Sequence, residues 1–514
     1  MKGFSRSAQR AGPGSGWRPA GWCVLTVCFW VSSAVVGFAQ PRTAKVAGRF
    51  YPENRSELLD LISELLQRQP EPTATQKPRA VIVPHAGYQY SGLIAADAFR
   101  QLQGHTYDGV VVVGFTHRGQ FDGSSVDTRE AYQTPLGEIP VDQEAVALLQ
   151  ASPGIHHVEE AHESDEHSLE VELPFLQVTL DRFRLAPILM GNAGLEDAAR
   201  LADALAALSR LGDYLFVFST DLSHYHPYDE AMRIDERTVN AILFETPQAV
   251  NRLFARGELE ACGRGPILTS VLLAKRLGYL KRELLYHANS GDTAGDPSSV
   301  VGYAAIAMYD RPPEFAQRLS PEAGAALVEA ARRSLERSLR AVGRKEAEDD
   351  ALPAAALGRY PELSKAQGLF VTLRKRGVLR GCIGRIETDE PLAKAISEVA
   401  LDAALHDSRF SPVSAEELKD IQVEVSVLTP PVTLASAKEV VAGRDGVILD
   451  YQGHRGVFLP QVWDETGWTR LEFLRELASQ KAGLPPDAWQ QATLSVFQDQ
   501  AFEEPSFDKL RTAP

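Results

Sequence analysis

Cysteine is scarce in this chain, with four residues in 514. Cys23 and Cys28 lie in an apolar N-terminal stretch, which leaves Cys262 and Cys382 for the rest of the chain. Disulfide-bonded exported proteins usually hold their cysteines in near pairs, whereas these two fall in segments with different patterns. We therefore predict two separate thiols, each of which needs burial or a bound metal in an oxidising compartment.

Signatures of several common function classes are also absent. The formal net charge is −15 and Lys and Arg are not clustered, which argues against a nucleic-acid partner. The chain has no Walker loop, no glycine fingerprint after a strand and no Gly-x-Ser-x-Gly elbow. The segment from His162 to His167 has the wrong spacing for a zinc-protease helix. Nucleotide-dependent enzymes and hydrolases are therefore disfavoured.

The N-terminus carries an export pattern. Four basic residues and no acid precede an uncharged apolar run from Gly21 to Ala39, and small residues stand before Gln40. This arrangement is typical of a secretory signal peptide over residues 1–39, so we expect a periplasmic or cell-envelope location. The alternative is an uncleaved membrane anchor, since 19 residues could just span a bilayer.

A Pro-rich break at Arg311-Pro312-Pro313 divides the remaining chain. Ser320-Pro321-Glu322 predicts the start of a helix that continues to about Arg340, so we place a linker at residues 311–319. The segment 320–506 reads as an α+β domain, with strands at 369–373 and 421–428, a helix at 391–406 and a polar connection at 344–363. A C-terminal tail occupies residues 507–514.

Between residues 41 and 310, short apolar strands alternate with helices. We predict strands at 80–83, 109–113 and 214–218, and helices at 56–67, 195–209 and 267–277. This alternation is typical of an α/β fold built on a layered sheet.

Each of the three strands runs into a polar loop that contains a histidine. These loops carry His85, His117, and Asp221 with His224. Because ligands bind outside the carboxyl ends of strands in open α/β sheets, the loops are expected to form one pocket. A single loop histidine is usually bound by backbone, but three at successive strand ends favour a site. Two or three imidazoles with a carboxylate or thiolate suit iron, copper or zinc.

Two further segments could contribute to this pocket. Cys262 precedes the predicted helix at 267, whose dipole would favour a thiolate that acts as metal ligand or nucleophile; the alternative is a small buried apolar residue. Glu166 and His167 precede an apolar helix and could act as acid or base, or as an N-terminal cap of that helix.

Five segments in order resemble the Memo family across about residues 42–310. They are Val46-Ala47-Gly48-Arg49-Phe50-Tyr51-Pro52, Pro84-His85-Ala86-Gly87-Tyr88 with Tyr90-Ser91-Gly92, Glu166-His167-Ser168-Leu169-Glu170, Asp221-Leu222-Ser223-His224 and Cys262-Gly263-Arg264. The resemblance implies a fold similar to class III extradiol dioxygenases. It also implies iron or copper ligands at His85, His117 and Cys262, with Asp221 and His224 in the same pocket.

The implied ligand set departs from that of the dioxygenases, in which two histidines and a glutamate bind the metal. A thiolate in place of the carboxylate shifts metal preference toward copper(I) or zinc, so ring cleavage is not implied. Eukaryotic Memo proteins bind phosphotyrosine peptides, so a small-molecule or peptide ligand is expected at this pocket.

The segment 320–506 resembles the AMMECR family, through Leu379-Arg380-Gly381-Cys382-Ile383-Gly384, Asp407-Ser408-Arg409-Phe410-Ser411-Pro412 and the strand Glu424-Val425-Ser426-Val427-Leu428. Arg380 and Cys382, in what we interpret as a glycine-bounded turn, could form an anion or thiol site. A tight turn that needs glycine explains the motif equally well.

The fusion of the two domains resembles the AmmeMemoRadiSam system, which implies a radical SAM protein as partner. The iron–sulfur cluster would belong to that partner, because this chain lacks the cysteines for one. The leading hypothesis is a metal-dependent redox enzyme, with Asp221, His224, His167 and Glu166 as acid, base or orienting groups. The alternative is a metal- or peptide-binding module or scaffold without turnover.

Overall fold

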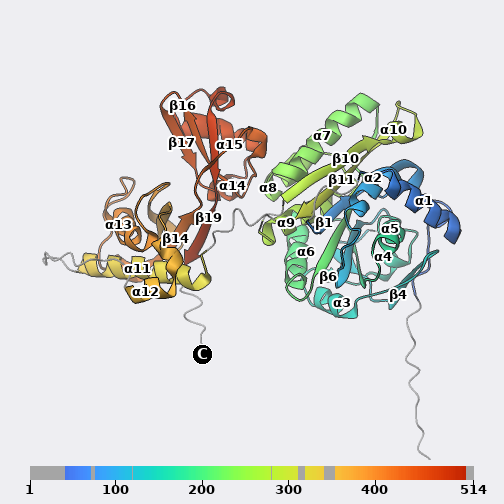
Figure 1. Ribbon diagram of the computed structural model, residues 1–514, viewed down its shortest axis with the longest axis horizontal. Helices are drawn as coiled ribbons and strands as arrows, with labels where there is room; N and C mark the ends of the chain where they lie inside the picture. The colour runs from blue at the N-terminus through green and yellow to red at the C-terminus, as the bar shows by residue number, and fades with distance from the viewer. Residues whose placement is uncertain are drawn as a thin grey trace, which may run out of the picture. The chain divides into compact units, whose positions relative to one another are not determined.

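The computed structural model describes residues 41–70, 76–118, 120–278, 281–310, 319–340 and 354–504 (Figure 1). The expected signal peptide at 1–39, most of the linker at 311–319 and the tail at 507–514 lie outside these residues. None of the described helices is both long enough and apolar enough to cross a membrane.

The first domain alternates strands and helices. Its elements are α1 (Arg55–Gln67), β1 (Pro78–Val83), α2 (Tyr88–Arg100), β2 (Gly109–Phe115), β3 (Ser124–Val126), β4 (Ala131–Thr134), β5 (Gly137–Pro140), α3 (Gln143–Gln150), β6 (Ile155–His156), α4 (Glu159–Glu163), α5 (Glu172–Thr179), β7 (Leu185–Met190), α6 (Leu195–Leu208), β8 (Tyr214–Ser219), β9 (His224–His226), α7 (Tyr228–Phe244), α8 (Pro247–Ala255), α9 (Arg264–Arg276), β10 (Lys281–Asn289), α10 (Ser290–Ala294) and β11 (Val300–Tyr309).

One sheet organises this domain, with strand order β10-β11-β1-β8-β2-β7-β3-β6 and β9 paired to β11. The central strands β1, β8, β2 and β7 are parallel, whereas β11 runs antiparallel to β1. The continuous apolar run Val110–Val113 is fully buried, as expected for a strand covered on both faces. The expected α/β layered sheet is therefore present.

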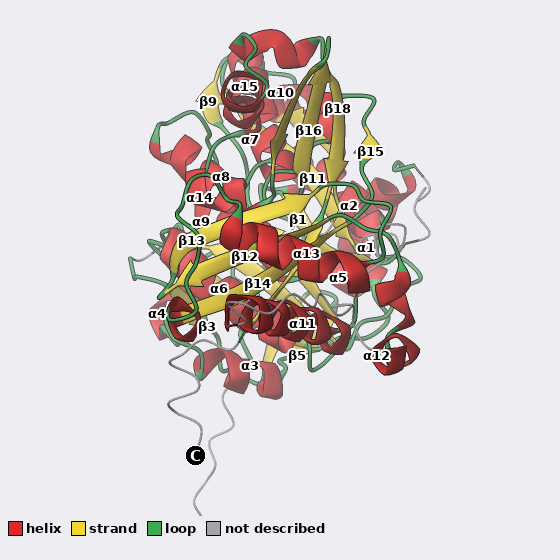
Figure 2. Cartoon of the chain, turned by 90° about the vertical axis from the view of Figure 1, so that its left-hand side faces the viewer, coloured by secondary structure: helices red, strands yellow, loops and turns green. Residues whose placement is uncertain are grey.

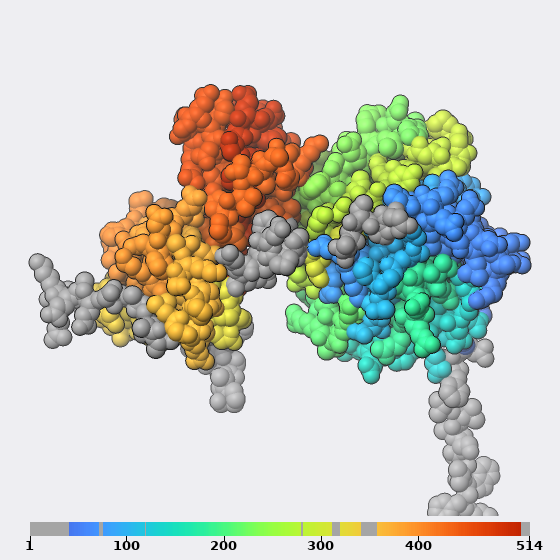
Figure 3. Space-filling view, in the orientation of Figure 1, coloured from blue at the N-terminus to red at the C-terminus, as the bar shows by residue number. Residues whose placement is uncertain are grey.

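Helices cover both faces of this sheet (Figure 1), and Figure 3 shows the first domain, coloured blue to yellow-green, as one packed body. Helix α9 contacts β1, β2 and β8 and packs on α6, while α2 contacts β1 and β11. The predicted helix at 267–277 begins three residues earlier than expected, at Arg264. Pro266 is tolerated there because the first-turn amides of a helix have no partner within the helix.

The second domain has elements α11 (Pro321–Arg340), α12 (Ala354–Arg359), η2 (Pro361–Ser364), β12 (Leu369–Lys375), β13 (Val378–Arg385), α13 (Leu392–Leu405), η3 (Glu417–Asp420), β14 (Ile421–Leu428), β15 (Val432–Thr433), η4 (Ala437–Glu439), β16 (Gly446–Tyr451), β17 (His454–Phe458), α14 (Gln461–Thr466), α15 (Arg470–Glu476), η5 (Leu477–Lys481), η6 (Pro486–Gln490), β18 (Thr493–Phe497) and β19 (Asp499–Glu503).

Two four-stranded antiparallel sheets make up this domain, ordered β13-β12-β14-β19 and β15-β18-β16-β17 (Figure 2). Helices α11 and α13 pack against each other, and α13 also packs on β12 and β13. The predicted strands and the helix between them are present. The described part of the polar connection predicted at 344–363 links α11 to β12 through the short helix α12 and the start of η2, and its last residue, Leu363, is fully buried.

The glycine-bounded turn predicted at Arg380-Gly381-Cys382 is also wrong, because the motif lies within strand β13. Its glycines are explained by close packing. A Cβ on Gly381 would lie 2.2 Å from the carbonyl oxygen of Ala403 in α13, and one on Gly384 would lie 2.2 Å from the ring of Phe370.

Candidate metal centre

His85 lies just beyond the end of β1 and is 1% exposed. Its backbone N–H donates to Oδ1 of Asp221 at 2.8 Å, and its ring Nδ1 lies 2.7 Å from Oγ of Ser219, the last residue of the neighbouring strand β8. The ring is therefore fixed through Nδ1, and Nε2 remains available for another partner. Burial, reinforced by the nearby histidines, lowers the pKa of His85 well below its ordinary value, which favours the neutral ring that a metal requires.

His117 lies two residues beyond the end of β2 and is held by Glu166. Oε1 of Glu166 lies 3.0 Å from Nδ1 of His117, and Oε2 accepts the His117 backbone N–H. The same carboxylate accepts the backbone N–H groups of His167 at 2.9 Å and Ser168 at 2.8 Å. Burial opposes ionisation of Glu166, but these hydrogen bonds outweigh it and hold its pKa below the ordinary value. His117 is thus oriented like His85, with Nε2 available.

Cys262 stands two residues before α9 and places its thiol beside His85. Sγ lies 3.2 Å from Nε2 of His85, and the backbone N–H of Asp221 donates to Sγ at 3.2 Å. The backbone N–H of Gly263 at the helix start favours the thiolate, as expected, but in the metal-free protein other effects outweigh it. Burial, with the nearby Asp221 carboxylate, raises the thiol pKa to about 12. A bound metal would reverse this, because a coordinating thiol loses its proton.

These three side chains meet at the carboxyl edge of the sheet. The ligand atoms of His85, His117 and Cys262 all lie within 4.8 Å of one another, and the two imidazole rings are perpendicular with centroids 5.2 Å apart. Two of the three strand-end histidines expected to converge, His85 and His117, therefore meet here with Cys262. The set could hold a metal ion, since two imidazoles and a thiolate are common donors to zinc, copper and iron.

The remaining pocket residues border this cluster. Oδ2 of Asp221 lies 4.0 Å from Nε2 of His85, and burial raises the pKa of Asp221 to about 7. His167 stacks between Phe50 and His117, with ring centroids 4.4 Å and 4.5 Å away, and burial lowers its pKa to about 4. With His117 and Glu166 it forms a second group close enough to hold a metal. This second group is the weaker candidate for a metal site, because the carboxylate oxygens of Glu166 already accept hydrogen bonds.

His224 begins strand β9, where its Nδ1 lies 2.8 Å from the carbonyl oxygen of Leu222. It belongs to neither group of potential ligands within the described residues. Its influence is electrostatic, since its proximity contributes to the lowered pKa of His85.

Two functional residues were missed by the sequence reasoning. Ser219 holds the ring of His85, and its hydroxyl donates to Oε1 of Glu172 at 2.8 Å. Both residues are buried. The sequence indicated them only as polar residues in apolar surroundings. Ser219 is the last residue of a buried strand, and Glu172 is the first residue of the apolar helix α5.

In the second domain, the hydrogen bonds of the Arg380-Gly381-Cys382 motif on β13 indicate a structural role. Arg380 binds Glu417 at 3.1 Å and the carbonyl oxygen of Ser411 at 2.8 Å, so its guanidinium is already engaged. Cys382 is a free thiol whose Sγ accepts from Thr372 at 3.3 Å. Cys262 is free as well, as predicted.

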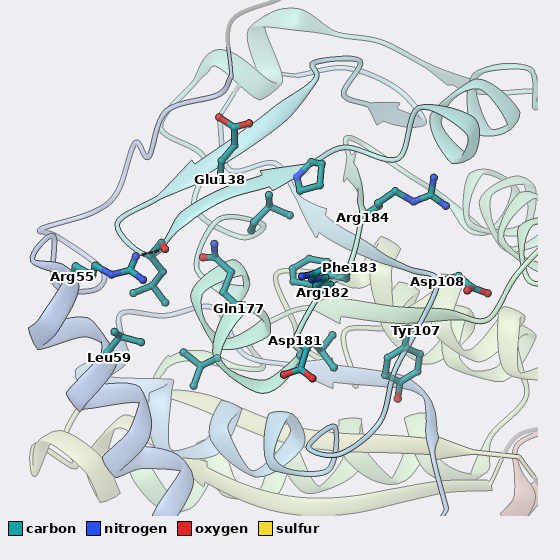
Figure 4. A pocket seen from close by; sticks show the side chains of 15 residues that line it. Arg55, Leu59, Tyr107, Asp108, Glu138, Gln177, Asp181, Arg182, Phe183 and Arg184 are labelled. Atoms are coloured by element: carbon teal, nitrogen blue, oxygen red, sulfur yellow. Dashed lines mark hydrogen bonds between the residues drawn. The ribbon is translucent and has the colours of Figure 1, made fainter.

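A cavity of about 860 Å³ lies at the other edge of the first domain's sheet (Figure 4). Its lining includes Asp108, which directly precedes β2, and Arg184, which directly precedes β7. It is therefore at the amino ends of strands whose carboxyl ends point toward the histidine cluster. None of His85, His117 and Cys262 lines it.

Comparison with known proteins agrees with this division into two domains. A family model described as Memo-like protein matches residues 42–307, and one described as AMMECR1 matches residues 328–502. A MEMO1 family protein of Ignicoccus hospitalis is 37% identical over 278 residues, which is 52% of this chain and 97% of that relative. A second, of Methanopyrus kandleri, is 33% identical over 276 residues, covering 52% of this chain and 98% of the relative.

Two solved structures are also similar. An uncharacterized protein of Pyrococcus horikoshii has 39% identity over 36% of this chain and 93% of its own length, with a TM-score of 0.33. An uncharacterized protein of Escherichia coli K12 has 17% identity over 45% of this chain and 99% of its own, also with a TM-score of 0.33. From the matched regions and the curated relatives, the chain belongs to the Memo-like family and carries an AMMECR1 domain after its Memo-like domain.

Proposed function

We propose that the Memo-like domain is a metal-dependent redox enzyme that holds iron or copper with His85, His117 and Cys262. The observation that carries this proposal is the matched orientation of the two imidazoles. Each has its Nδ1 engaged, by Ser219 in one case and Glu166 in the other, which leaves both Nε2 atoms for a metal beside the Cys262 thiol.

The number of ligands favours a catalytic metal over a purely structural one. A structural zinc site is usually closed by four protein ligands, whereas only three ligands meet in the described cluster. Bound iron or copper would supply electron transfer to dioxygen or to an organic substrate. The soft sulfur donor favours copper(I) among the redox metals.

The surrounding residues would transfer protons or orient other groups at this site. Asp221, with its pKa raised to about 7, is suited to give or accept a proton at Oδ2 near neutral pH. His167 stacks on His117 with its ring neutral, and its lowered pKa makes it a weak base that is better suited to orient a bound molecule than to accept its proton. Glu166 accepts hydrogen bonds from four N–H groups, so its oxygens are occupied. It therefore acts as an orienting residue and not as an acid or base.

Metal analysis of purified protein tests the ligand assignment. The double variant His85→Ala with Cys262→Ser should lose bound iron or copper almost completely, because two of three donors are removed. A matched control, His156→Ala with Cys382→Ser, also removes one imidazole and one thiol, but both lie outside the cluster. Metal content unchanged in the first variant, or lost equally in both, would contradict the assignment.

Oxygen uptake then separates an enzyme from a binding module. Metal-loaded protein with ascorbate should consume oxygen faster than metal-free protein, and the double variant should match the metal-free rate. If metal is bound but uptake stays at the metal-free rate, the domain is a metal- or peptide-binding module without turnover.

A further inference from the structure

A chain of four hydrogen-bonded groups runs from the metal centre into the protein interior. Sγ of Cys262 lies 3.2 Å from Nε2 of His85, Nδ1 of His85 lies 2.7 Å from Oγ of Ser219, and that hydroxyl donates to Oε1 of Glu172 at 2.8 Å. His85, Ser219 and Glu172 are each at most 1% exposed. The chain therefore ends at a carboxyl group away from solvent.

The burial of Glu172 is not explained by an ion pair. Among the described residues no arginine, lysine or histidine forms an ion pair with it, and burial raises its pKa well above the ordinary value. Glu170 offers a contrast two residues earlier. It is equally buried, but it pairs with Arg42 at 2.6 Å and accepts from Tyr51 at 2.7 Å. A buried carboxyl without a cation is costly, so a role for Glu172 beyond folding is expected.

The hydroxyl of Ser219 has one proton to donate, and this determines the tautomer of His85. When the hydroxyl donates to Glu172, it can only accept from His85, so the proton of the neutral imidazole must lie on Nδ1. Oε1 of Glu172 can accept this bond in both the neutral and the ionised form. Without Glu172 the hydroxyl is free to donate to Nδ1, which would move the ring proton to Nε2 and block that atom as a ligand.

We propose that Glu172, acting through Ser219, is the positioning residue that fixes His85 with its proton on Nδ1 and so keeps Nε2 open for the metal. This inference rests on the proposed function for its purpose, since it assumes that His85 is a ligand. The hydrogen-bond geometry that carries it belongs to the metal-free protein. Neither Glu172 nor Ser219 is itself a ligand or a catalytic residue.

Nitrogen NMR of metal-free protein with isotope-labelled histidine reports the tautomer directly. The His85 signals are identified by their loss in His85→Asn. In wild type, Nδ1 should show the shift of a protonated nitrogen and Nε2 that of an unprotonated one. In Glu172→Leu and Ser219→Ala the two should exchange or average, whereas Ser219→Thr, which keeps the hydroxyl, should resemble wild type.

Affinity for Zn²⁺, measured by competition with a chromophoric chelator, gives a second readout that is independent of turnover. Glu172→Leu and Ser219→Ala should weaken Zn²⁺ binding about 10- to 100-fold, as for other residues that orient a metal-binding histidine. Ser219→Thr should restore affinity to within about threefold of wild type. Glu170→Gln is the matched control for a disturbed buried carboxylate and should leave both tautomer and affinity unchanged.

Some outcomes would overturn the proposal. These are a proton on Nε2 in wild type, an unchanged tautomer in both Glu172→Leu and Ser219→Ala, or the same change in Glu170→Gln. If Glu172→Leu does not fold, the Ser219→Ala and Ser219→Thr pair decides, because it differs by the presence of the hydroxyl. Failure of the proposed function looks different, since absent oxygen uptake would leave the tautomer signals as expected.

Discussion

Glu166 shows at the residue scale how this site is stabilised. Its carboxylate accepts hydrogen bonds from four N–H groups. Two are the backbone N–H groups of His167 and Ser168, and two belong to the backbone and ring of His117, which lies 49 residues earlier in the chain. Such a group cannot readily give up its hydrogen bonds to take or deliver a proton. Its contribution is to hold His117 in the orientation that exposes Nε2.

Replacement of Glu166 should therefore weaken both metal binding and folding. In Glu166→Gln, the new amide N–H groups would face existing donors, so at least one hydrogen bond to a charged group is lost at a cost of about 2 kcal/mol. We expect about tenfold weaker Zn²⁺ binding and a lower free energy of unfolding for the first domain. Chelator competition and denaturant unfolding followed by tyrosine circular dichroism measure these effects.

The exposed residue Glu160 in α4 supplies the control, because its side chain has no comparable partners in the part of the chain that the structure describes. Glu160→Gln should behave as wild type in both measurements. Tight metal binding retained in Glu166→Gln would show that His117 does not need this carboxylate.

The residues of the cluster and the Glu166 support of His117 were predictable, but the residues that support His85 were not. His85, His117 and Cys262 were named because parallel strands bring their carboxyl ends to one edge and because the motifs resemble a family. Glu172 and Ser219 were missed because their contact joins positions 47 residues apart, and neither position has a local pattern that indicates it. The raised pKa of Cys262 was also missed, since burial is a property of the folded chain.

At the scale of elements, strand β13 shows why glycine can mislead a sequence-based prediction. Gly381 suggested a turn, but its backbone does not need positive φ; the glycine is needed because α13 crosses close to the strand. Glycine is favoured both where a turn needs its backbone freedom and where another element packs too closely for a side chain. The sequence alone does not distinguish these two reasons. The long strands and helices were predicted well because their apolar periodicity spans many residues.

Gly381→Ala tests this packing argument. The new methyl group would meet the Ala403 carbonyl oxygen at 2.2 Å, so β13 and α13 must separate, at a cost of about 1–3 kcal/mol. Hydrogen–deuterium exchange should quicken for amides of β13 and α13 and stay unchanged in the first domain.

A glycine with open surroundings gives the comparison. A Cβ on Gly358, in helix α12, would meet no atom within 4 Å, so Gly358→Ala should be neutral or stabilising by about 0.5–1 kcal/mol. Equal effects of the two substitutions would count against steric contact as the reason for Gly381.

On the scale of the whole molecule, buried neutral histidines make the first domain sensitive to acid. His162 is 1% exposed, and burial lowers its pKa from 6.5 to about 4, although the nearby Asp127 opposes the shift. Between these two values the unfolded chain binds a proton that the folded chain does not. Stability contributed by neutral His162 is therefore present above about pH 6.5 and is lost as pH falls toward 4.

We expect this single histidine to account for up to about 3 kcal/mol of the acid destabilisation of the first domain. His162→Gln should flatten the fall in stability below neutral pH, even if it lowers stability at neutral pH through loss of the 3.0 Å contact with Ser125. Hydrogen exchange of β3 and β7 amides across the pH range measures the slope. A slope equal to that of wild type would exclude His162 as a contributor.

The arrangement of the sheet also sets the order in which this site can come into being during synthesis. His85 and Cys262 touch in the finished fold but are 177 residues apart along the chain. A nascent chain that has passed His117 offers the imidazoles of His85 and His117 without the Cys262 thiol, and β8 must still insert between β1 and β2 before their loops are correctly spaced. A metal held by all three proposed ligands would therefore bind only after the sheet is complete, because Cys262 joins the two imidazoles last.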